Sequence, residues 1–108
     1  IAYKTATRLS ESNERADAVR LTALHDCTVV PYKVMLAARS ALETADELRA
    51  VVKPAAQSDL EEGRLLLKAA AESAWLNIKA NLALMEKDIF YRDYDANGRA
   101  LLEWIREA

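Results

Sequence analysis

Residues 58–88, SDLEEGRLLLKAAAESAWLNIKANLALMEKD, decide the fold that this sequence predicts. Drawn as a helix, this stretch is apolar around most of its circumference, and a helix of that kind is surrounded by others. A capping box, with Ser58 as N-cap and Glu61 reaching back to it, marks the start. We expect the helix to continue to about residues 89–92.

Three polar side chains interrupt this helix where an ordinary core helix would be apolar. Asn77, Asn81 and Asp88 are spaced by four and seven residues. They therefore fall within roughly 40° of one another on the helix surface. The same stripe contains small and apolar residues, namely Ala70, Ser73, Ala74 and Leu84. The pattern predicts a polar pocket on a packed helix face.

A second long helix is predicted earlier in the chain. Apolar residues recur at steps of three and four both before and after Pro31. Proline lacks a backbone donor, so we expect Pro31 to kink this helix, which covers about residues 13–52, without ending it. Residues 1–11 would form a short helix or an ordered arm. Cys27 falls in the core phase, as a small apolar residue.

The remaining segments are short. Pro54 disfavours helix for the residue before it, so residues 53–57 are expected to be a linker. A last helix begins at Asp93 or Asp95, or near residue 98 if Asn97-Gly98 makes a turn. Its predicted buried face consists of Leu101, Leu102, Trp104 and Ile105.

The composition is typical of all-α proteins. Ala and Leu make up a third of the 108 residues, whereas Gly and Pro contribute two each, and strong helix formers dominate. We predict a bundle of long antiparallel helices in a single domain, residues 1–108, or in the C-terminal part of one. The chain is too short to cover residues 65–85 alone, so we expect a homo-oligomer, most simply a homodimer.

Charge and composition also exclude several function classes. The formal net charge is −2 with interspersed charges, so we expect no nucleic-acid partner. No apolar run approaches the roughly 20 residues that span a bilayer, so we expect no membrane association. The single cysteine fits a reducing, cytoplasmic compartment. With one histidine and one cysteine, the sequence carries no metal-ligand signature, and we expect no metal.

The two asparagines of the stripe have a functional and a structural interpretation. An amide offers a donor and an acceptor together, so Asn77 and Asn81 could bind a heteroaromatic or amide-bearing ligand. They could equally form hydrogen bonds between helices that fix the helix register. The residues alone leave both interpretations open.

Other polar residues are open to the same two interpretations. Asp88 could act as a general acid or base, or could pair with a neighbouring basic residue. Ser58 and Asp59 primarily start a helix, although a helix N-terminus also favours an anionic group. His25 could be a general base, but a lone histidine on a helix more often lies at the surface or the core edge.

Three pieces of the chain resemble one enzyme family in their order and spacing. They are Thr28-Val29-Val30-Pro31, then Ser58-Asp59 after a linker, then Ala74-Trp75-Leu76-Asn77-Ile78-Lys79-Ala80-Asn81-Leu82 followed by Asp88. Together they resemble the cyclodeaminase/cyclohydrolase family of folate enzymes over about residues 12–92. The family's Gly-Gly-Gly-Ser segment and the second long helix after it have no counterpart here. The resemblance thus implies a bundle that is incomplete without an N-terminal helical half.

The resemblance implies a folate one-carbon enzyme, either a methenyltetrahydrofolate cyclohydrolase or a formimidoyltetrahydrofolate cyclodeaminase. A tetrahydrofolate derivative would be the substrate, and no cofactor would be bound. In this scheme we assign Asp88 to proton transfer, and Asn77, Asn81, Ser58 and Asp59 to substrate binding. The alternative is a non-catalytic helical-bundle module for oligomerisation or binding, derived from the same family.

Overall fold

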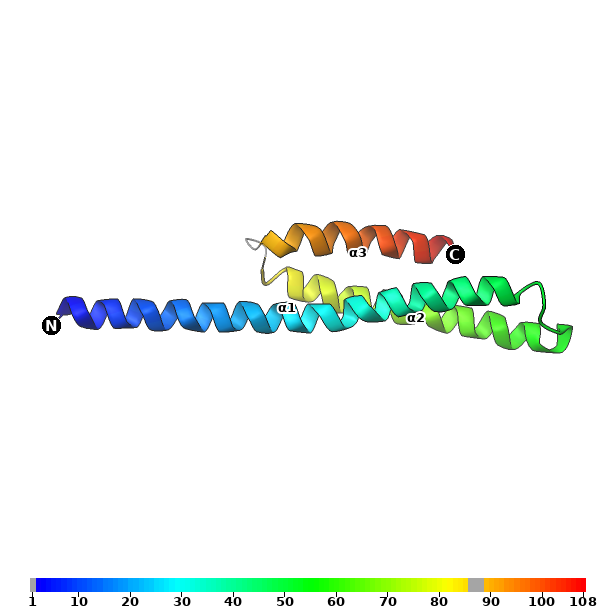
Figure 1. Cartoon of the computed structure of the whole chain (residues 1–108), viewed down its shortest axis with the longest axis horizontal. Coiled ribbons are helices and arrows are strands. Elements are labelled where there is room, and N and C mark those ends of the chain that lie inside the picture. Colours follow the sequence, from blue (N-terminus) through cyan, green and yellow to red (C-terminus); the bar gives the residue numbers. More distant parts are fainter. Residues whose placement is uncertain (1, 86–88) are drawn as a thin grey trace.

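The computed structural model describes residues 2–85 and 89–108, with side chains from residue 13 onward. These residues form α1 (Ala2–Leu48), the short 3-10 helix η1 (Pro54–Ala56), α2 (Gln57–Leu82) and α3 (Ile89–Glu107). Figure 1 shows α1 and α2 as an antiparallel hairpin, with α3 running back along it. Each α-helix contacts the other two. The predicted all-α bundle of long antiparallel helices is confirmed.

Helix α1 begins earlier and ends earlier than the sequence predicted. It runs without a break from Ala2, so the predicted boundary between an arm and a helix at residues 12–13 is wrong. Residues 2–12 contain neither glycine nor proline, and nothing in them stops the helix. The helix ends at Leu48, where the carbonyl accepts a turn hydrogen bond from the N–H of Val52 at 2.9 Å.

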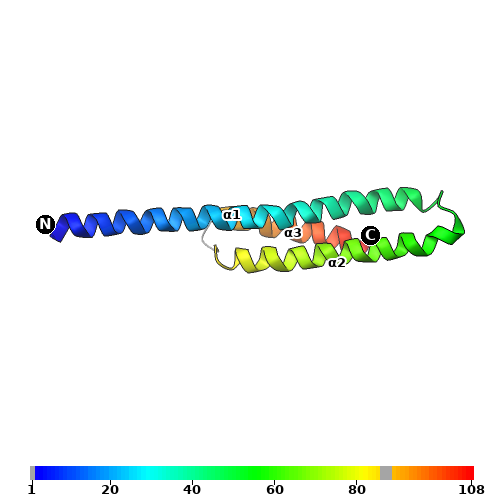
Figure 2. The same ribbon diagram turned by 90° about the horizontal axis from the view of Figure 1, so that it is seen from below.

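Pro31 lies inside α1 and does not end it, as predicted. Figures 1 and 2 show the axis of α1 changing direction slightly in its cyan part, in agreement with the predicted kink. The proline ring also removes one backbone N–H from the helix ladder. The carbonyl that loses this donor belongs to Cys27, four residues earlier.

Helix α2 does not start as predicted. Its N-cap is Ala56, with no side-chain capping bond, so the capping box at Ser58 is wrong. Pro54 opens η1, whose turn leads straight into α2. Ser58 therefore lies inside the first turn of α2, one residue after its start.

Helix α2 also ends sooner than predicted. It stops at Leu82, so the expected continuation to residues 89–92 is wrong, and α3 already begins at Ile89. The N–H groups of Leu84 and Met85 donate to carbonyls three residues earlier, at 3.1 and 3.0 Å, which makes a tight turn. Met85 is buried, so its side chain holds this turn against the core.

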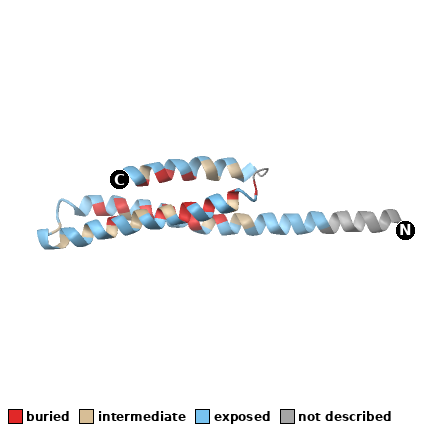
Figure 3. Cartoon of the chain, turned by 180° about the vertical axis from the view of Figure 1, so that it is seen from behind, coloured by how far each residue is buried: buried red, intermediate tan, exposed pale blue. Residues whose placement is uncertain are grey.

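The core lies where the three helices overlap, as the red segments of Figure 3 show. The predicted buried face of α3 is confirmed for Leu101, Leu102 and Ile105, whereas Trp104 is only partly buried. Gly98 is buried inside α3, so the alternative turn at Asn97-Gly98 is wrong. The remaining members of the core come from α1, α2 and the turn after α2: Met35, Ala38, Leu42, Ala71, Ala74, Trp75, Ile78, Leu82 and Met85.

Arg64 ties the three helices together at the end of the bundle away from the α2–α3 turn. Its side chain is buried, and its guanidinium donates to the carboxylate of Asp46 on α1 and to the carbonyl of Ala108 after α3. Glu61 on α2 lies 3.7 Å from the same guanidinium. A buried guanidinium needs such partners, since removing them would leave an uncompensated charge.

Much of the chain lies outside this core. The molecule measures 79 × 19 × 16 Å, and α1 extends far beyond the other helices, with residues 13–23 exposed. Leu65, Leu66 and Leu76 on α2 are exposed by 65% or more, so the expectation that α2 is surrounded is not met within one chain. No helix in the described part is long and apolar enough to cross a membrane.

An ion pair between α2 and α3 makes the fold sensitive to acid. Arg106 donates to Glu72 at 2.9 Å, and this hydrogen bond lowers the pKa of Glu72. The pair therefore stabilises the fold above the ordinary glutamate pKa, about 4.3. This contribution is lost as the pH falls through the lower, folded-state pKa of Glu72.

We expect Glu72→Gln to flatten the acid side of a plot of Tm against pH. The effect is small and screened by salt, because both side chains are exposed. Glu103→Gln, at an exposed position on α3, is the matched control and should leave the profile unchanged. Identical profiles for Glu72→Gln and the unsubstituted protein would contradict this prediction.

Candidate functional site

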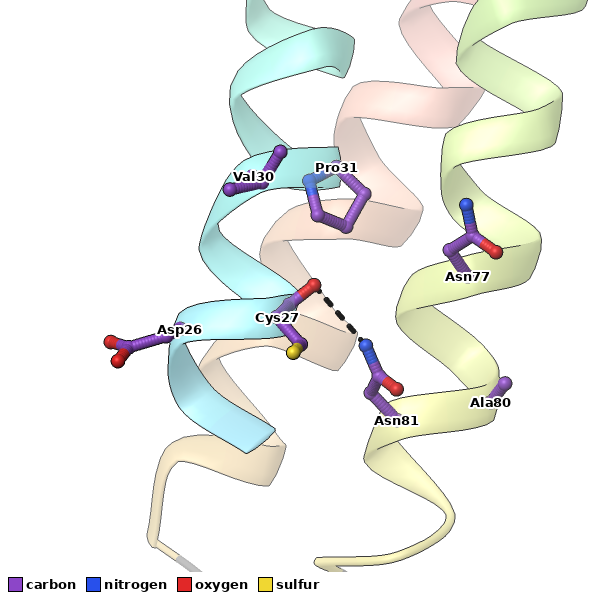
Figure 4. Close-up of a pocket in the computed structure, with 7 residues that line it drawn as sticks. All are labelled: Asp26, Cys27, Val30, Pro31, Asn77, Ala80 and Asn81. Carbon is purple, nitrogen blue, oxygen red and sulfur yellow. Dashed lines mark hydrogen bonds between the residues drawn. The ribbon is translucent and has the colours of Figure 1, made fainter. Parts of the chain in front are cut away.

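The predicted pocket is an open groove between α1 and α2. Its larger part has a volume of about 430 Å³ and is lined by Asp26, Cys27, Val30, Pro31, Asn77, Ala80 and Asn81 (Figure 4). A second part, of about 310 Å³, shares three of these residues and is also lined by Val34, Ala70, Ser73 and Ala74. Short side chains on α2 thus face the proline of α1, and the helices leave space between them. The amides and small residues of the predicted stripe do line a pocket.

Asn81 bridges the two walls of this groove. Its Nδ2 donates to the backbone oxygen of Cys27 at 3.2 Å, shown as the dashed line in Figure 4. Pro31 has no N–H to give to this oxygen, so the asparagine of α2 takes the place of the missing backbone donor. The structural interpretation of Asn81, a hydrogen bond between helices, therefore matches the geometry.

Asn77 lies one turn before Asn81 and is exposed. It lines both parts of the groove, and Figure 4 places it across from Pro31. Its side chain makes no hydrogen bond to another residue in the described part of the chain. Its amide thus keeps a donor and an acceptor for a ligand in the groove.

The α1 wall contains residues that the sequence interpretation placed elsewhere. Cys27 is exposed, so its prediction as a core residue is wrong. Thr28 is fully buried instead, and its hydroxyl donates to the carbonyl of Leu24 at 2.7 Å. The hydroxyl is satisfied within its own helix, which allows the polar residue to take the buried position. Asp26 also lines the groove, although Figure 4 shows its carboxylate pointing away from Asn77.

The other predicted site residues do not gather at this groove. Ser58 and Asp59 are exposed in the first turn of α2. Ser58 precedes Asn77 by 19 residues, which corresponds to about 28 Å along a helix. Asp88 lies outside the described residues. Because α2 ends at Leu82, the helical spacing that aligned Asp88 with the asparagines does not apply.

Two further features of the site region concern histidine and metal ligands. His25 packs edge-on against Phe90 of α3, with ring centroids 4.4 Å apart. In the part of the chain that the structure describes, no group of three or more His, Cys, Asp and Glu side chains is placed to hold a metal ion.

Comparison with models of protein families shows to which family the chain belongs. The model of the formiminotransferase-cyclodeaminase family matches residues 1–99. The chain therefore belongs to this folate-related family, and the resemblance predicted over about residues 12–92 is confirmed over a longer range. Comparisons with curated proteins and with solved structures gave no match.

Proposed function

We propose that the protein is a folate one-carbon enzyme, a methenyltetrahydrofolate cyclohydrolase or a formimidoyltetrahydrofolate cyclodeaminase. The family match supports the folate class. The observation that carries the proposal is the position of Asn77: its side chain is exposed and lines a groove together with Val30 and Pro31. A pterin has flat apolar faces and an edge of alternating donors and acceptors. An amide side chain matches that edge, because it offers one group of each kind.

The two reactions share one chemical requirement. A cyclohydrolase adds water to the methenyl carbon and breaks its bond to one bridge nitrogen, which takes up a proton. A cyclodeaminase joins the formimino carbon to the second bridge nitrogen and releases ammonia. In the first reaction protons move between oxygen and nitrogen atoms, and in the second they move between nitrogen atoms. Both reactions therefore call for a general acid or base. We assign this role to Asp88, on the chemistry of its carboxylate and its position in the family pattern.

Among the residues proposed to bind substrate, Asn77 is the one that we assign to the pterin. One N–H of Asn81 already donates to the carbonyl of Cys27, so this amide has one donor fewer for a ligand. Ser58 and Asp59 lie about 28 Å from Asn77 along α2. We therefore propose them only for a substrate contact outside the groove. No metal and no bound cofactor enter the proposal.

Asn77→Ala in the full-length protein tests the assignment. We expect it to raise KM for methenyltetrahydrofolate by about 5- to 150-fold, since a ligand group that loses its hydrogen-bond partner costs about 1–3 kcal/mol. Asn97→Ala, at an exposed position on α3, should leave KM unchanged. If Asn77→Ala keeps the KM of the unsubstituted protein, the pterin does not bind at this amide.

The second candidate function is a non-catalytic module for oligomerisation, with a second copy of the chain as the partner. The exposed leucines of α2, Leu65, Leu66 and Leu76, favour it. A homodimer that sediments as a stable species would fit either candidate, so turnover decides between them. A folded, full-length protein with no turnover of either folate substrate would favour the module.

A further inference from the structure

Pro31 leaves one carbonyl of α1 without its helical partner. In an α-helix the N–H of each residue donates to the carbonyl four residues earlier, and proline has no N–H to donate. Here that carbonyl belongs to Cys27, and the only interhelical donor drawn to it in Figure 4 is the amide of Asn81, at 3.2 Å. The two residues of this bond are 54 positions apart in the chain.

We propose that Asn81 is a positioning residue, which replaces the backbone hydrogen bond lost at Pro31 and so fixes the register of α1 against α2. A carbonyl oxygen only accepts hydrogen bonds, so the amide nitrogen is the group that meets it. Sliding α2 by one turn would move Asn81 by about 5.4 Å. That displacement exceeds hydrogen-bond range, so the bond forms in one register only.

This register is also the one that opens the groove. With Asn81 on the carbonyl of Cys27, the small residues Ala70, Ser73 and Ala74 lie opposite Pro31 and Val34. A slip of one turn in one direction would bring Leu66 to the place that Ala70 now holds in this wall, and a leucine would fill space that the alanine leaves open. Asn81 thus acts on the site through the spacing of its walls, while Asn77 lines the groove itself.

The inference makes Pro31 and Asn81 dependent on each other, which a double-mutant cycle measures. Asn81→Ala should lower the Tm by about 4–8 °C, the shift expected for one typical hydrogen bond in a domain of this size. In a Pro31→Ala background the backbone N–H at position 31 is restored and takes the carbonyl of Cys27. There, Asn81→Ala should cost less than half as much.

Two further variants sharpen the cycle. Asn77→Ala, one turn away on the same helix, should change the Tm equally in both backgrounds. Asn81→Asp keeps the shape of the side chain, but its carboxylate has no donor at neutral pH, so it should lower the Tm at least as much as Asn81→Ala. Equal losses for Asn81→Ala with and without Pro31→Ala would overturn the inference.

A kinetic measurement separates positioning from direct binding, and this arm alone rests on the proposed function. Because Pro31 itself lines the groove, the single Pro31→Ala variant is the reference: Asn81→Ala should raise KM for methenyltetrahydrofolate in the unsubstituted protein and by less than half as large a factor in the Pro31→Ala background. A ligand contact made by Asn81 itself would be lost equally in both backgrounds, and equal rises in KM would contradict positioning. If the unsubstituted protein shows no turnover, the proposed function fails, and the thermal cycle still decides on Asn81.

Discussion

Asp88→Asn in the full-length protein should lower the turnover of methenyltetrahydrofolate by about 10²- to 10⁴-fold, the usual contribution of a general acid or base. The amide has almost the volume and shape of the carboxylate, so the fold and the Tm should change little. What the variant loses is the carboxyl group that we propose as the proton carrier. A steady-state assay of ring opening, with kcat and KM determined separately, measures the effect.

The loss should fall on kcat, because a proton carrier acts on the reacting bond and contributes little to ground-state binding. Asp93→Asn is the matched control, since Asp93 is an exposed aspartate in the first turns of α3. It should keep the kcat of the unsubstituted protein. Unchanged turnover in folded Asp88→Asn would remove Asp88 from the mechanism.

Gly98→Ala should destabilise the protein, although alanine is a better helix former. A Cβ at this position would overlap Cζ3 of Trp75, a residue that is 5% exposed. The ring cannot move aside without disturbing the core, and overpacking of this kind costs about 1–3 kcal/mol. That cost exceeds the gain in helix propensity, which is at most about 1 kcal/mol.

Gly63→Ala is the control, and its effect should have the opposite sign. Gly63 also lies in a helix, but a Cβ there meets nothing within 4 Å in the described part of the structure. Only the propensity gain remains, and the free energy of unfolding should rise by about 0.5–1 kcal/mol. Chemical unfolding of both variants measures the difference. A Gly98→Ala protein as stable as Gly63→Ala would show that the Trp75 contact does not constrain the core.

Helical periodicity carried most of the fold prediction, because it reports which side chains share a face. It placed Leu101, Leu102 and Ile105 in the core, continued α1 through Pro31, and brought Asn77 to the side of α2 that lines the groove. These results need only the spacing of residues along one helix. They hold even where the ends of the helices were predicted wrongly.

The errors arose where tertiary contacts override the local pattern. Met85 is apolar and in phase with α2, yet it is buried from a turn, so the pattern extended the helix too far. Asn97-Gly98 was predicted as a possible turn, but Gly98 lies inside α3. The glycine is there because it lets Trp75 approach the backbone of α3. Thr28 lies in the core at the level where Cys27 was predicted. The threonine hydroxyl can be buried because it donates to a backbone carbonyl of its own helix.

The partner of Asn81 shows the limit most clearly. The sequence indicates that Pro31 deprives the carbonyl of Cys27 of a donor, since that relation lies within one helix. Which residue replaces the donor depends on the register of α1 against α2, which no spacing along one helix contains. The two asparagines looked equivalent in sequence, and the structure separates them: one amide bridges the helices, and the other faces the groove.

The placement of a folate at Asn77 is tested most directly by NMR of the protein labelled with ¹⁵N in its asparagine side chains. The chain contains four asparagines, Asn13, Asn77, Asn81 and Asn97, and the first and last lie away from the groove. Titration with 5-formyltetrahydrofolate, a stable folate, should shift the side-chain amide signal of Asn77 most and leave Asn13 and Asn97 unmoved. A saturating titration that leaves Asn77 unmoved would contradict a folate site in the groove between α1 and α2.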